Sequence, residues 1–386
     1  MLKIILIFIV FYGNKVKSDK NVHNVLLLGG NGLLGSAVTQ MLLRVKDVKY
    51  NITILNRGNW YWDTENIIKP FVNHIKCSRE DGFREMCTQL ADNTKYDSVV
   101  DFSAYDPLDI EDILIVMPGR FKRYIYISSD SVYEVCLPKK HDGYLREEDA
   151  VRPTDQTVLE KYNSRDNYGH KKLEGEEVLD RFHKVLDFDY ISLRLPDVIG
   201  PRDNTNRFWK YYMWAKINHI AGPVHITPNL RDKPLSFVYS LDVGGLIANL
   251  VHPNFNMDGI FNQAYNLGFK ETVTLKQFVD FVGKFANTSI QFDETDQAVK
   301  NFGFPSVSIG PVDINNAMQL LKWQPTDLYT ALEKTSQFYE DAEYDDEYKF
   351  IVDRILNALD VHQLKRHEFL LFHHERQNSR HNKDEL

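Results

Sequence analysis

The stretch Asn24–Arg44, NVLLLGGNGLLGSAVTQMLLR, predicts how the fold begins. It opens with an apolar run, Val25–Leu28, which is typical of a buried strand, and then breaks into glycines. Apolar residues return with helical spacing at Val38, Met41 and Leu42. The stretch therefore predicts a strand, a tight glycine turn and a helix, in that order.

The glycines of this turn, Gly29, Gly32 and Gly35, follow the pattern Gly-x-x-Gly-x-x-Gly. One glycine makes the tight turn, one lets the backbone approach a pyrophosphate, and one lets the helix pack closely on the strand. A helix N-terminus also favours an anion. A plain glycine turn is the alternative, but the strand before it and the helix after it favour a dinucleotide site. The cofactor contacts predicted here are Gly29, Asn31, Gly32, Leu33, Leu34 and Gly35.

The second predicted strand, YNITILNRG at 50–58, indicates which dinucleotide is bound. A site for NAD usually has an acid at the end of this strand, where it holds the ribose hydroxyls. This chain has Asn56 and Arg57 there. A guanidinium can bind a 2′-phosphate with two hydrogen bonds, although a solvated loop arginine is the alternative. We therefore expect Asn56 and Arg57 in the cofactor site, and NADP favoured over NAD.

Two more predicted strands follow, YDSVVDFSAY at 96–105 and RYIYISSDSVY at 123–133, with helical stretches between them. Such alternation is typical of βαβ units. The sequence thus predicts an α/β fold, a doubly wound parallel sheet (Rossmann) with a smaller α/β substrate lobe. Ligands bind beyond the carboxyl ends of such strands, which is where Ser103 and Ser129 lie.

The pattern Tyr-x-x-x-Lys occurs twice, as Tyr168 and Lys172 in DNYGHKKLEGEE and as Tyr212 and Lys216 in KYYMWAK. Residues four apart share one face of a helix, so either pair could transfer protons together. The spacing alone does not choose between them.

Seven stretches of sequence, in order along the chain, distinguish between the two Tyr-x-x-x-Lys pairs. The sequence resembles the extended short-chain dehydrogenase/reductase family, also called the NAD-dependent epimerase/dehydratase family. The resemblance implies that Ser129, Tyr168 and Lys172 are catalytic, and that Tyr168 and Lys172 also contact the cofactor. Tyr212 and Lys216 fall outside the motif's place and are interpreted as helix residues beneath the substrate region. The stretches are GGNGLLG, YIYISSDSVY, YGHKKLEGEE, LRLPDVIGPRD, SFVYSLDVGGLI, YNLG and LLKWQPTDLYTALEKT.

The chemistry of this set explains its residue types. A free Tyr has a pKa of about 10, and a nearby ammonium and the positive nicotinamide both favour its phenolate. Ser129 would hydrogen-bond the substrate oxygen while Tyr168 takes or returns its proton. The expected function is that of an NAD(P)-dependent oxidoreductase or epimerase. The alternatives are a surface helix with a spare Tyr, and a non-catalytic nucleotide-binding relative that acts as a scaffold or binding protein.

The chain departs from the family pattern where nucleotide sugars bind. Asp197 stands in LRLPDVIGP where such members often have an Asn that donates to the diphosphate, and Leu235 stands where they have an Arg. Asp130 and Ser131 replace the Asp-Glu pair of the dehydratase branch, which disfavours 4,6-dehydration. We expect a small-molecule substrate other than a typical nucleotide sugar, with a nucleotide-sugar epimerase or dehydratase as the alternative.

Both ends of the chain carry targeting signals. In MLKIILIFIVFYGNKVKS, at 1–18, a lysine precedes an apolar run too short to span a bilayer, and small residues suit cleavage after Ser18. The last four residues, KDEL at 383–386, form a retention signal of the endoplasmic reticulum. Together they predict a protein of the endoplasmic reticulum lumen that binds the KDEL receptor and does not insert into the membrane. A buried first strand and a charged tail are the alternatives.

The 386 residues suggest roughly two domains after the signal peptide, 1–18. We expect a Rossmann domain from 24–200 plus 236–265 and a substrate lobe from 201–235 plus 266–338. Residues 339–386 are expected to form an acidic and helical C-terminal extension that ends in KDEL. The aromatic clusters NWYW and RFWKYYMW are interpreted as packing rather than substrate stacking. The net charge of −8 argues against nucleic acid as a partner, and a homodimer is a candidate assembly.

The cysteines are Cys77, Cys87 and Cys136. The lumen permits disulfides, and Cys77 and Cys87 could bridge, but two buried thiols are the favoured interpretation. No Cys-x-x-Cys occurs, so no metal site is expected. The histidines near the end are interpreted as part of a solvated tail; they are His362, His367, His373 and His374.

Overall fold

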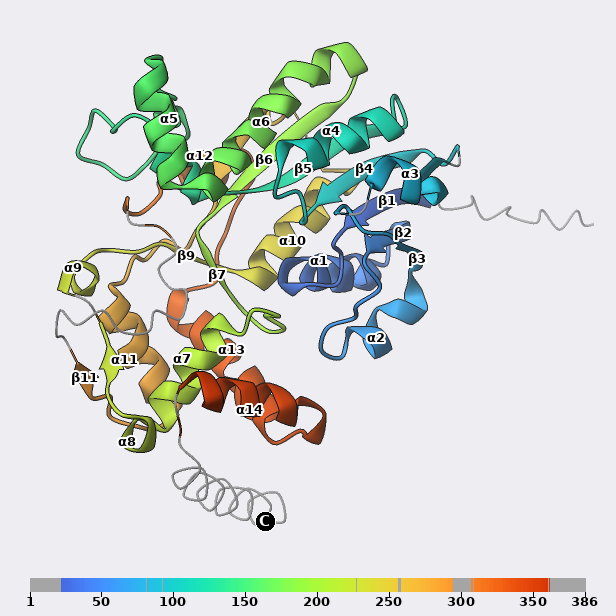
Figure 1. Ribbon diagram of the computed structural model, residues 1–386. Helices are drawn as coiled ribbons and strands as arrows, with labels where there is room; N and C mark the ends of the chain where they lie inside the picture. Colours follow the sequence, from blue (N-terminus) through green and yellow to red (C-terminus); the bar gives the residue numbers. More distant parts are fainter. Residues whose placement is uncertain are drawn as a thin grey trace, which may run out of the picture.

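A seven-stranded parallel sheet forms the centre of the molecule (Figure 1). The computed structural model describes residues 22–359 and 361, apart from 81, 92, 227, 256–257, 294–306 and 308. The strand order is β10-β6-β5-β4-β1-β2-β3, and each neighbouring pair is parallel. The prediction of a doubly wound Rossmann sheet is confirmed. The strands are β1 (Val22–Leu28), β2 (Lys49–Asn56), β3 (Asn73–Lys76), β4 (Tyr96–Asp101), β5 (Phe121–Ser129), β6 (Asp189–Leu195) and β10 (Gln263–Asn266).

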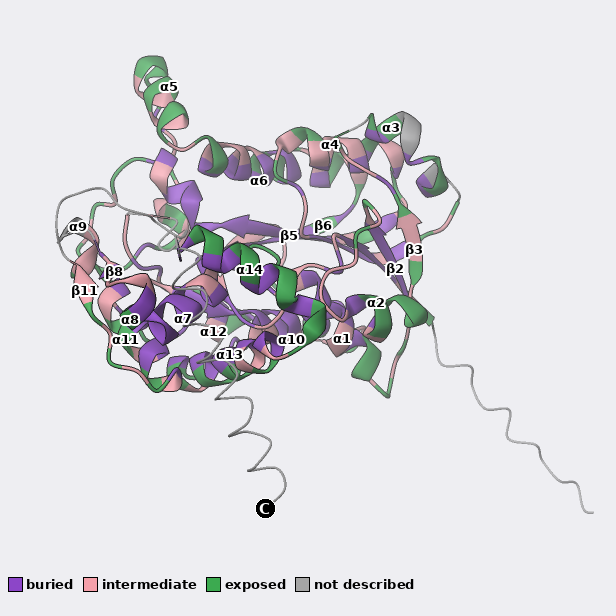
Figure 2. Ribbon diagram, turned by 60° about the horizontal axis from the view of Figure 1, so that its bottom comes forward, coloured by how far each residue is buried: buried purple, intermediate pink, exposed green. Residues whose placement is uncertain are grey.

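Helices cover both faces of this sheet (Figure 2). On one face lie α4 (Pro107–Val116) and α6 (Asn167–Leu186), and on the other α1 (Leu33–Arg44) and α10 (Ser240–Leu250). Helix α10 packs closely on α1. Gly244 makes this possible, because a Cβ at this position would lie only 3.0 Å from Ala37. The strands are apolar along most of their length because they are buried on both faces. The strand order reverses between β1 and β4, and ligands bind at such switch points.

Shorter helices connect these elements. The α-helices are α2 (Thr64–Ile67), α3 (Phe83–Met86), α5 (Gln156–Arg165) and α12 (Asn315–Leu320). The 3-10 helices are η1 (Lys69–Phe71), η2 (Thr88–Ala91), η3 (Asp130–Val135), η4 (Glu147–Asp149) and η5 (Asp346–Tyr348).

A second group of helices packs around a separate apolar core at the lower left of Figure 1. The run RFWKYYMW lies in α7, and its Phe, Trp, Tyr and Met side chains are buried in this core. The predicted boundary between residues 338 and 339 falls inside α13, so the chain enters the C-terminal region within a helix. The elements are α7 (Arg207–Lys216), α8 (Asn218–Ala221), α9 (Pro228–Arg231), α11 (Leu275–Phe285), α13 (Leu328–Glu343) and α14 (Lys349–Ala358). Two small parallel sheets accompany them, β7 (Asp197–Ile199) with β9 (Phe237–Tyr239), and β8 (Val224–His225) with β11 (Phe292–Asp293).

The second Tyr-x-x-x-Lys pair belongs to this core. Lys216 is 0% exposed and donates to Glu340 and Glu343 at 2.7 Å each. Tyr212 donates to the same Glu340 carboxylate at 2.6 Å. Burial lowers the pKa of Lys216, but the carboxylates of Glu343 and Glu340 outweigh it and the pKa is raised. This pair therefore ties α7 to α13.

The two cysteines after β3 are bonded. Cys77 and Cys87 form a disulfide, with their Cα atoms 5.6 Å apart, so the interpretation as two buried thiols is wrong. Both residues reach the same apolar core between α3 and the sheet, which brings the sulfurs together. Cys136 is buried and free.

The predicted signal peptide, the KDEL sequence and the four C-terminal histidines lie outside the described residues. Within the described ranges, no helix is both long enough and apolar enough to cross a membrane. The same ranges contain no cluster of three His, Cys, Asp or Glu residues suited to a metal ion.

Candidate active site

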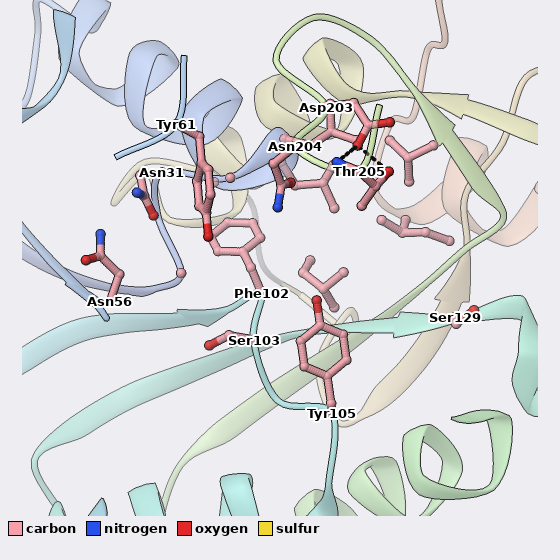
Figure 3. A pocket seen from close by; sticks show the side chains of 18 of the residues that line it. Asn31, Asn56, Tyr61, Phe102, Ser103, Tyr105, Ser129, Asp203, Asn204 and Thr205 are labelled. Atoms are coloured by element: carbon pink, nitrogen blue, oxygen red, sulfur yellow. Dashed lines mark hydrogen bonds between the residues drawn. The ribbon is translucent and has the colours of Figure 1, made fainter. Parts of the chain in front are cut away.

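One cavity of about 440 Å³ opens at the carboxyl ends of β1, β2, β4, β5 and β6 (Figure 3). The structure brings every predicted site residue to this cavity, although they are spread from position 29 to position 172. These lining residues are Gly29, Asn31, Gly32, Leu33, Leu34, Gly35, Asn56, Arg57, Ser103, Ser129, Tyr168 and Lys172.

The glycine turn at the end of β1 is shaped for close approach. Gly29 has a φ of +87°, which favours glycine, and a Cβ at Gly35 would collide with the carbonyl oxygen of Gly29. Gly32 faces the cavity and precedes α1 without a side-chain cap, so the first N–H groups of the helix remain available for an anion. This geometry fits the diphosphate of a dinucleotide.

Lys172 is held by main-chain carbonyls. Its ammonium donates to Ala104 at 2.8 Å and to Ile127 at 2.9 Å, and the residue is only 2% exposed. Burial lowers the pKa of Lys172 to about 8. The ammonium also lies 4.9 Å from the ring centre of Tyr105 and 5.7 Å from that of Tyr168. Lys172 thus places a positive charge at the floor of the cavity, beside two phenols.

Tyr168 lies in the first turn of α6 and is 43% exposed. Gly169 allows this placement, because a Cβ there would collide with the carbonyl of Ser131. Although much of the ring is exposed, desolvation of the phenol in the cavity, followed by the neighbouring Tyr105, raises the pKa of Tyr168, and the Ser129 side chain acts in the opposite direction. Tyr168 here keeps its proton at neutral pH and is set to donate it.

Ser129 ends β5 and is nearly buried. Its hydroxyl accepts from the Ser131 N–H at 3.1 Å and donates weakly to Asp130 at 3.4 Å. Burial, followed by the charge of Asp197, raises the pKa of Asp130 well above its usual range. The Ser129 hydroxyl is therefore fixed between the Ser131 N–H and the Asp130 carboxyl group. The raised pKa of Asp130 favours the protonated, uncharged form of that carboxyl group.

Asn56 and Arg57, the two residues predicted to contact the cofactor near its ribose, lie at the end of β2. Asn56 accepts from Gly58 N–H at 2.7 Å and contacts His74 at 2.9 Å through Oδ1. Its buried Nδ2 has no hydrogen-bond partner among the described residues. Arg57 is 56% exposed and pairs with Glu80 at 3.3 Å. A dinucleotide fits this end of the cavity, with a cation at its mouth.

Two loops border the cavity, and sequence reasoning assigned neither Tyr61 nor Asn204 to the site. Tyr61 and Asn204 both line the cavity and lie near each other in the view of Figure 3. The loops are joined by a two-bond ion pair between Arg202 and Asp63, at 2.5 and 2.6 Å. Trp62 packs against Trp209 and other rings of the lobe core, whereas Tyr61 lines the cavity. Only part of NWYW therefore serves packing. The sequence feature that could have indicated Tyr61 as a site residue is the aromatic cluster NWYW, which comes shortly after β2.

The substrate end of the cavity contains Asp197 together with Arg207, 3.1 Å apart. Leu235 is buried in the lobe core and pairs through its main chain with Val273. The structure places Arg207 in the lining together with Thr205. This end of the cavity therefore holds a carboxylate, Asp197, and a guanidinium, Arg207, in contact with each other.

Comparison with known proteins agrees with this geometry. Residues 25–267 match the model of the NAD dependent epimerase/dehydratase family. The chain is similar to the solved structure of UDP-glucuronic acid 4-epimerase from Bacillus cereus, in complex with UDP-glucuronic acid and NAD. That match has 19% identity and a TM-score of 0.62, and covers 82% of this chain and 99% of that one. The sequence matches no curated protein.

Two further structures have the same fold. A dTDP-glucose 4,6-dehydratase from Bacillus anthracis, in complex with NAD, is 16% identical with a TM-score of 0.62, covering 84% of this chain and 98% of that one. An epimerase from Methanothermobacter thermautotrophicus is 16% identical with a TM-score of 0.63, covering 83% and 92%. At these identities the likeness describes the fold and leaves the substrate open.

Proposed function

Since this chain is an enzyme of the NAD-dependent epimerase/dehydratase family, we propose that it transfers protons on a hydroxyl or carbonyl substrate with Ser129, Tyr168 and Lys172. The observation that carries the proposal is the convergence of these residues and the glycine turn on one cavity. When bound, the nicotinamide cofactor would accept or supply the hydride.

Each residue has a role that follows from its surroundings. Ser129, fixed by Ser131 N–H, holds the substrate oxygen. Tyr168 gives a proton to that oxygen when a carbonyl is reduced, and takes one when a hydroxyl is oxidised. Lys172 carries a positive charge near neutral pH, which favours the phenolate once the proton has left.

We also propose NADP as the favoured cofactor and the lumen of the endoplasmic reticulum as the location. Arg57 at the mouth of the cavity supports the cofactor, because a guanidinium suits a 2′-phosphate. The apolar run at 1–18 and KDEL at 383–386 support the location.

The proposed substrate is a small molecule other than a typical nucleotide sugar. Asp197 is paired with Arg207 and offers no hydrogen-bond donor at the place where one to a diphosphate is expected. The arginines that could replace the missing cation already have acidic partners: Arg202 pairs with Asp63, Arg207 with Asp197 and Arg231 with Asp232. Nucleotide-sugar epimerisation, which the name of a structural neighbour suggests, remains the alternative.

The test begins with a metabolite pull-down on the purified lumenal protein, with mass spectrometry to identify the substrate. Turnover is then measured for wild type, Tyr168→Phe and Tyr212→Phe. Loss of a general acid/base should slow Tyr168→Phe by about 10²–10⁴ while the cofactor still binds. Tyr212→Phe is the matched control, and we expect it to keep its turnover. Full activity of Tyr168→Phe would refute the mechanism.

A further inference from the structure

We propose that Asn287 carries an N-linked oligosaccharide, while Asn51 stays unmodified. This modification site goes beyond the reaction described above, and it rests on the lumenal location proposed with that reaction. The pattern Asn-x-Ser/Thr occurs twice in the sequence, as NIT at 51–53 and as NTS at 287–289. In a protein of the secretory pathway this pattern marks an acceptor asparagine on a surface loop. The two copies have different surroundings in the structure, and these surroundings favour the second.

Asn287 lies in the turn that ends α11, before the chain reaches β11. Its φ is +54°, the left-handed conformation in which a glycine or an asparagine commonly ends a helix. The N–H groups of Asn287 and Thr288 donate to the carbonyls of Lys284 and Gly283, at 3.1 and 3.0 Å. Asn287 is exposed, and its side chain has no hydrogen-bond partner among the described residues. The turn is therefore fixed by its main chain, and the amide nitrogen Nδ2 is left available.

The hydroxyl that completes the pattern is also available. Ser289 is exposed, and only its main-chain carbonyl is used, which accepts from Asn218 Nδ2 at 3.3 Å. The middle residue faces the other way, because the Thr288 hydroxyl donates to the carbonyl of Ala215 at 3.0 Å. Both groups that the pattern requires, the Asn287 amide and the Ser289 hydroxyl, thus lie on the surface of the lobe.

Asn51 has different surroundings, although it too is exposed. It lies in β2, and its Nδ2 donates to Oδ1 of Asn24 on β1 at 2.9 Å. Its Oδ1 accepts from Nδ2 of Asn73 on β3 at 2.8 Å, so three asparagine side chains form a row across the strands. The hydroxyl of this pattern belongs to Thr53, which is only 5% exposed within the sheet. A sugar on Asn51 would interrupt the row, and the folded sheet therefore disfavours it.

The modification is a transfer of a sugar to the amide nitrogen. The donor is an oligosaccharide carried on a lipid diphosphate, and a transferase of the lumenal membrane catalyses the step. A bond forms between Asn287 Nδ2 and the anomeric carbon of the first sugar, as the bond from that carbon to the diphosphate oxygen breaks. The lipid diphosphate leaves with the electron pair of the broken bond, and Nδ2 gives up one of its two protons to a base. Nothing is oxidised or reduced.

The proposed site is separate from the candidate active site. Helix α11 and strand β11 lie at the lower left of Figure 1, whereas β1 and β4, which end at the cavity, lie at the upper right. Asn287 does not line the cavity. We therefore expect that the protein binds NADPH equally well with and without the oligosaccharide.

The test uses the full chain, produced in eukaryotic cells with both ends intact. Treatment with peptide-N-glycosidase in heavy-oxygen water removes N-linked sugars and converts each modified asparagine into a heavy aspartate, which mass spectrometry locates. We expect the label at Asn287 and none at Asn51. Endoglycosidase H should also increase the gel mobility of the protein, because a protein retained in the endoplasmic reticulum keeps high-mannose sugars.

Matched variants separate the pattern from the turn. Ser289→Ala removes the required hydroxyl and leaves Asn287 in place, whereas Asn287→Gly removes the acceptor and suits the left-handed turn. Both should lose the mobility change. Ser289→Thr keeps the pattern and should keep the mobility change, and so should the control Asn51→Gln.

The outcomes separate this inference from the proposed location. An unlabelled Asn287 in a lumenal protein whose signal peptide has been removed would overturn the inference and leave the location standing. A cytosolic protein with Met1 intact would overturn the location and the inference together. A label at Asn51 would overturn the choice between the two patterns. Because the label is read on wild type, the test does not depend on whether a variant folds.

Discussion

Replacing Lys172 with methionine should change the stability of the protein by an amount that depends on pH. Burial lowers the pKa of Lys172 from 10.5 to about 8. Between these two values the unfolded chain holds a proton that the folded chain has released, so the free energy of unfolding rises with pH. Below pH 8 Lys172 is protonated in both the folded and the unfolded state. The full cost of burying its charge, roughly 3 kcal/mol, then lowers the free energy of unfolding.

The size of the change follows from that shift. Once pH exceeds the folded-state pKa, the penalty falls by about 1.4 kcal/mol per pH unit. Roughly 2 kcal/mol of it is relieved between about pH 7 and about pH 9.5. Methionine exchanges no proton. The difference in unfolding free energy between wild type and Lys172→Met should therefore move by roughly 2 kcal/mol in favour of wild type across this range.

The assay is urea unfolding, followed by tryptophan fluorescence at several pH values from neutral to mildly alkaline. Lys216→Met is the matched control, because the pKa of Lys216 is raised and its stabilising contribution is fully present below the unfolded value. Its loss removes the cation that Glu343 and Glu340 share in the lobe core and should cost about 3–5 kcal/mol at every pH in the range. A pH-independent difference for Lys172→Met would refute the reasoning about its burial.

Three further predictions concern the cofactor, the substrate and the location. NADPH should bind about tenfold more tightly than NADH, and Arg57→Asp should reverse the order, since one charged hydrogen bond contributes roughly 1.5–3 kcal/mol; equal affinities by calorimetry would remove Arg57 from the site. UDP, GDP and their common sugars should leave the melting temperature of wild type unchanged and raise that of Asp197→Asn with Leu235→Arg, whereas micromolar binding by wild type would make sugar epimerisation the leading function. Deleting residues 383–386 should cause secretion, and a full-length cytosolic protein with Met1 intact would contradict the location.

The part of the fold that the sequence predicts is the part controlled by local chemistry. The glycine turn after β1 leaves few choices of backbone, and an apolar strand buried on both faces reads as a continuous apolar run. The disulfide was only the alternative in the sequence analysis, because a spacing of ten residues between Cys77 and Cys87 is compatible with many geometries. Only the placement of α3 against the sheet decides that the two sulfurs meet.

The same distinction separates the predicted site residues from the missed ones. Ser129, Tyr168 and Lys172 lie in motifs with fixed order, so a resemblance can transfer them. Tyr61 and Asn204 lie in loops whose course depends on a long-range ion pair between Asp63 and Arg202. Such contacts carry no periodic signal, because the partners are brought together by tertiary packing and not by spacing.

The two Tyr-x-x-x-Lys pairs illustrate why environment decides function. Lys216 meets two carboxylates, which cancel its charge, and Tyr212 donates to one of them. A negative charge on Tyr212 would face a glutamate, so this phenol is poorly suited to release its proton. Lys172 instead donates to carbonyl oxygens, which hold it in place but carry no net charge. Its charge is therefore left to favour a phenolate on Tyr168 in the proton transfer that we propose, a role that the surroundings of Lys216 do not allow.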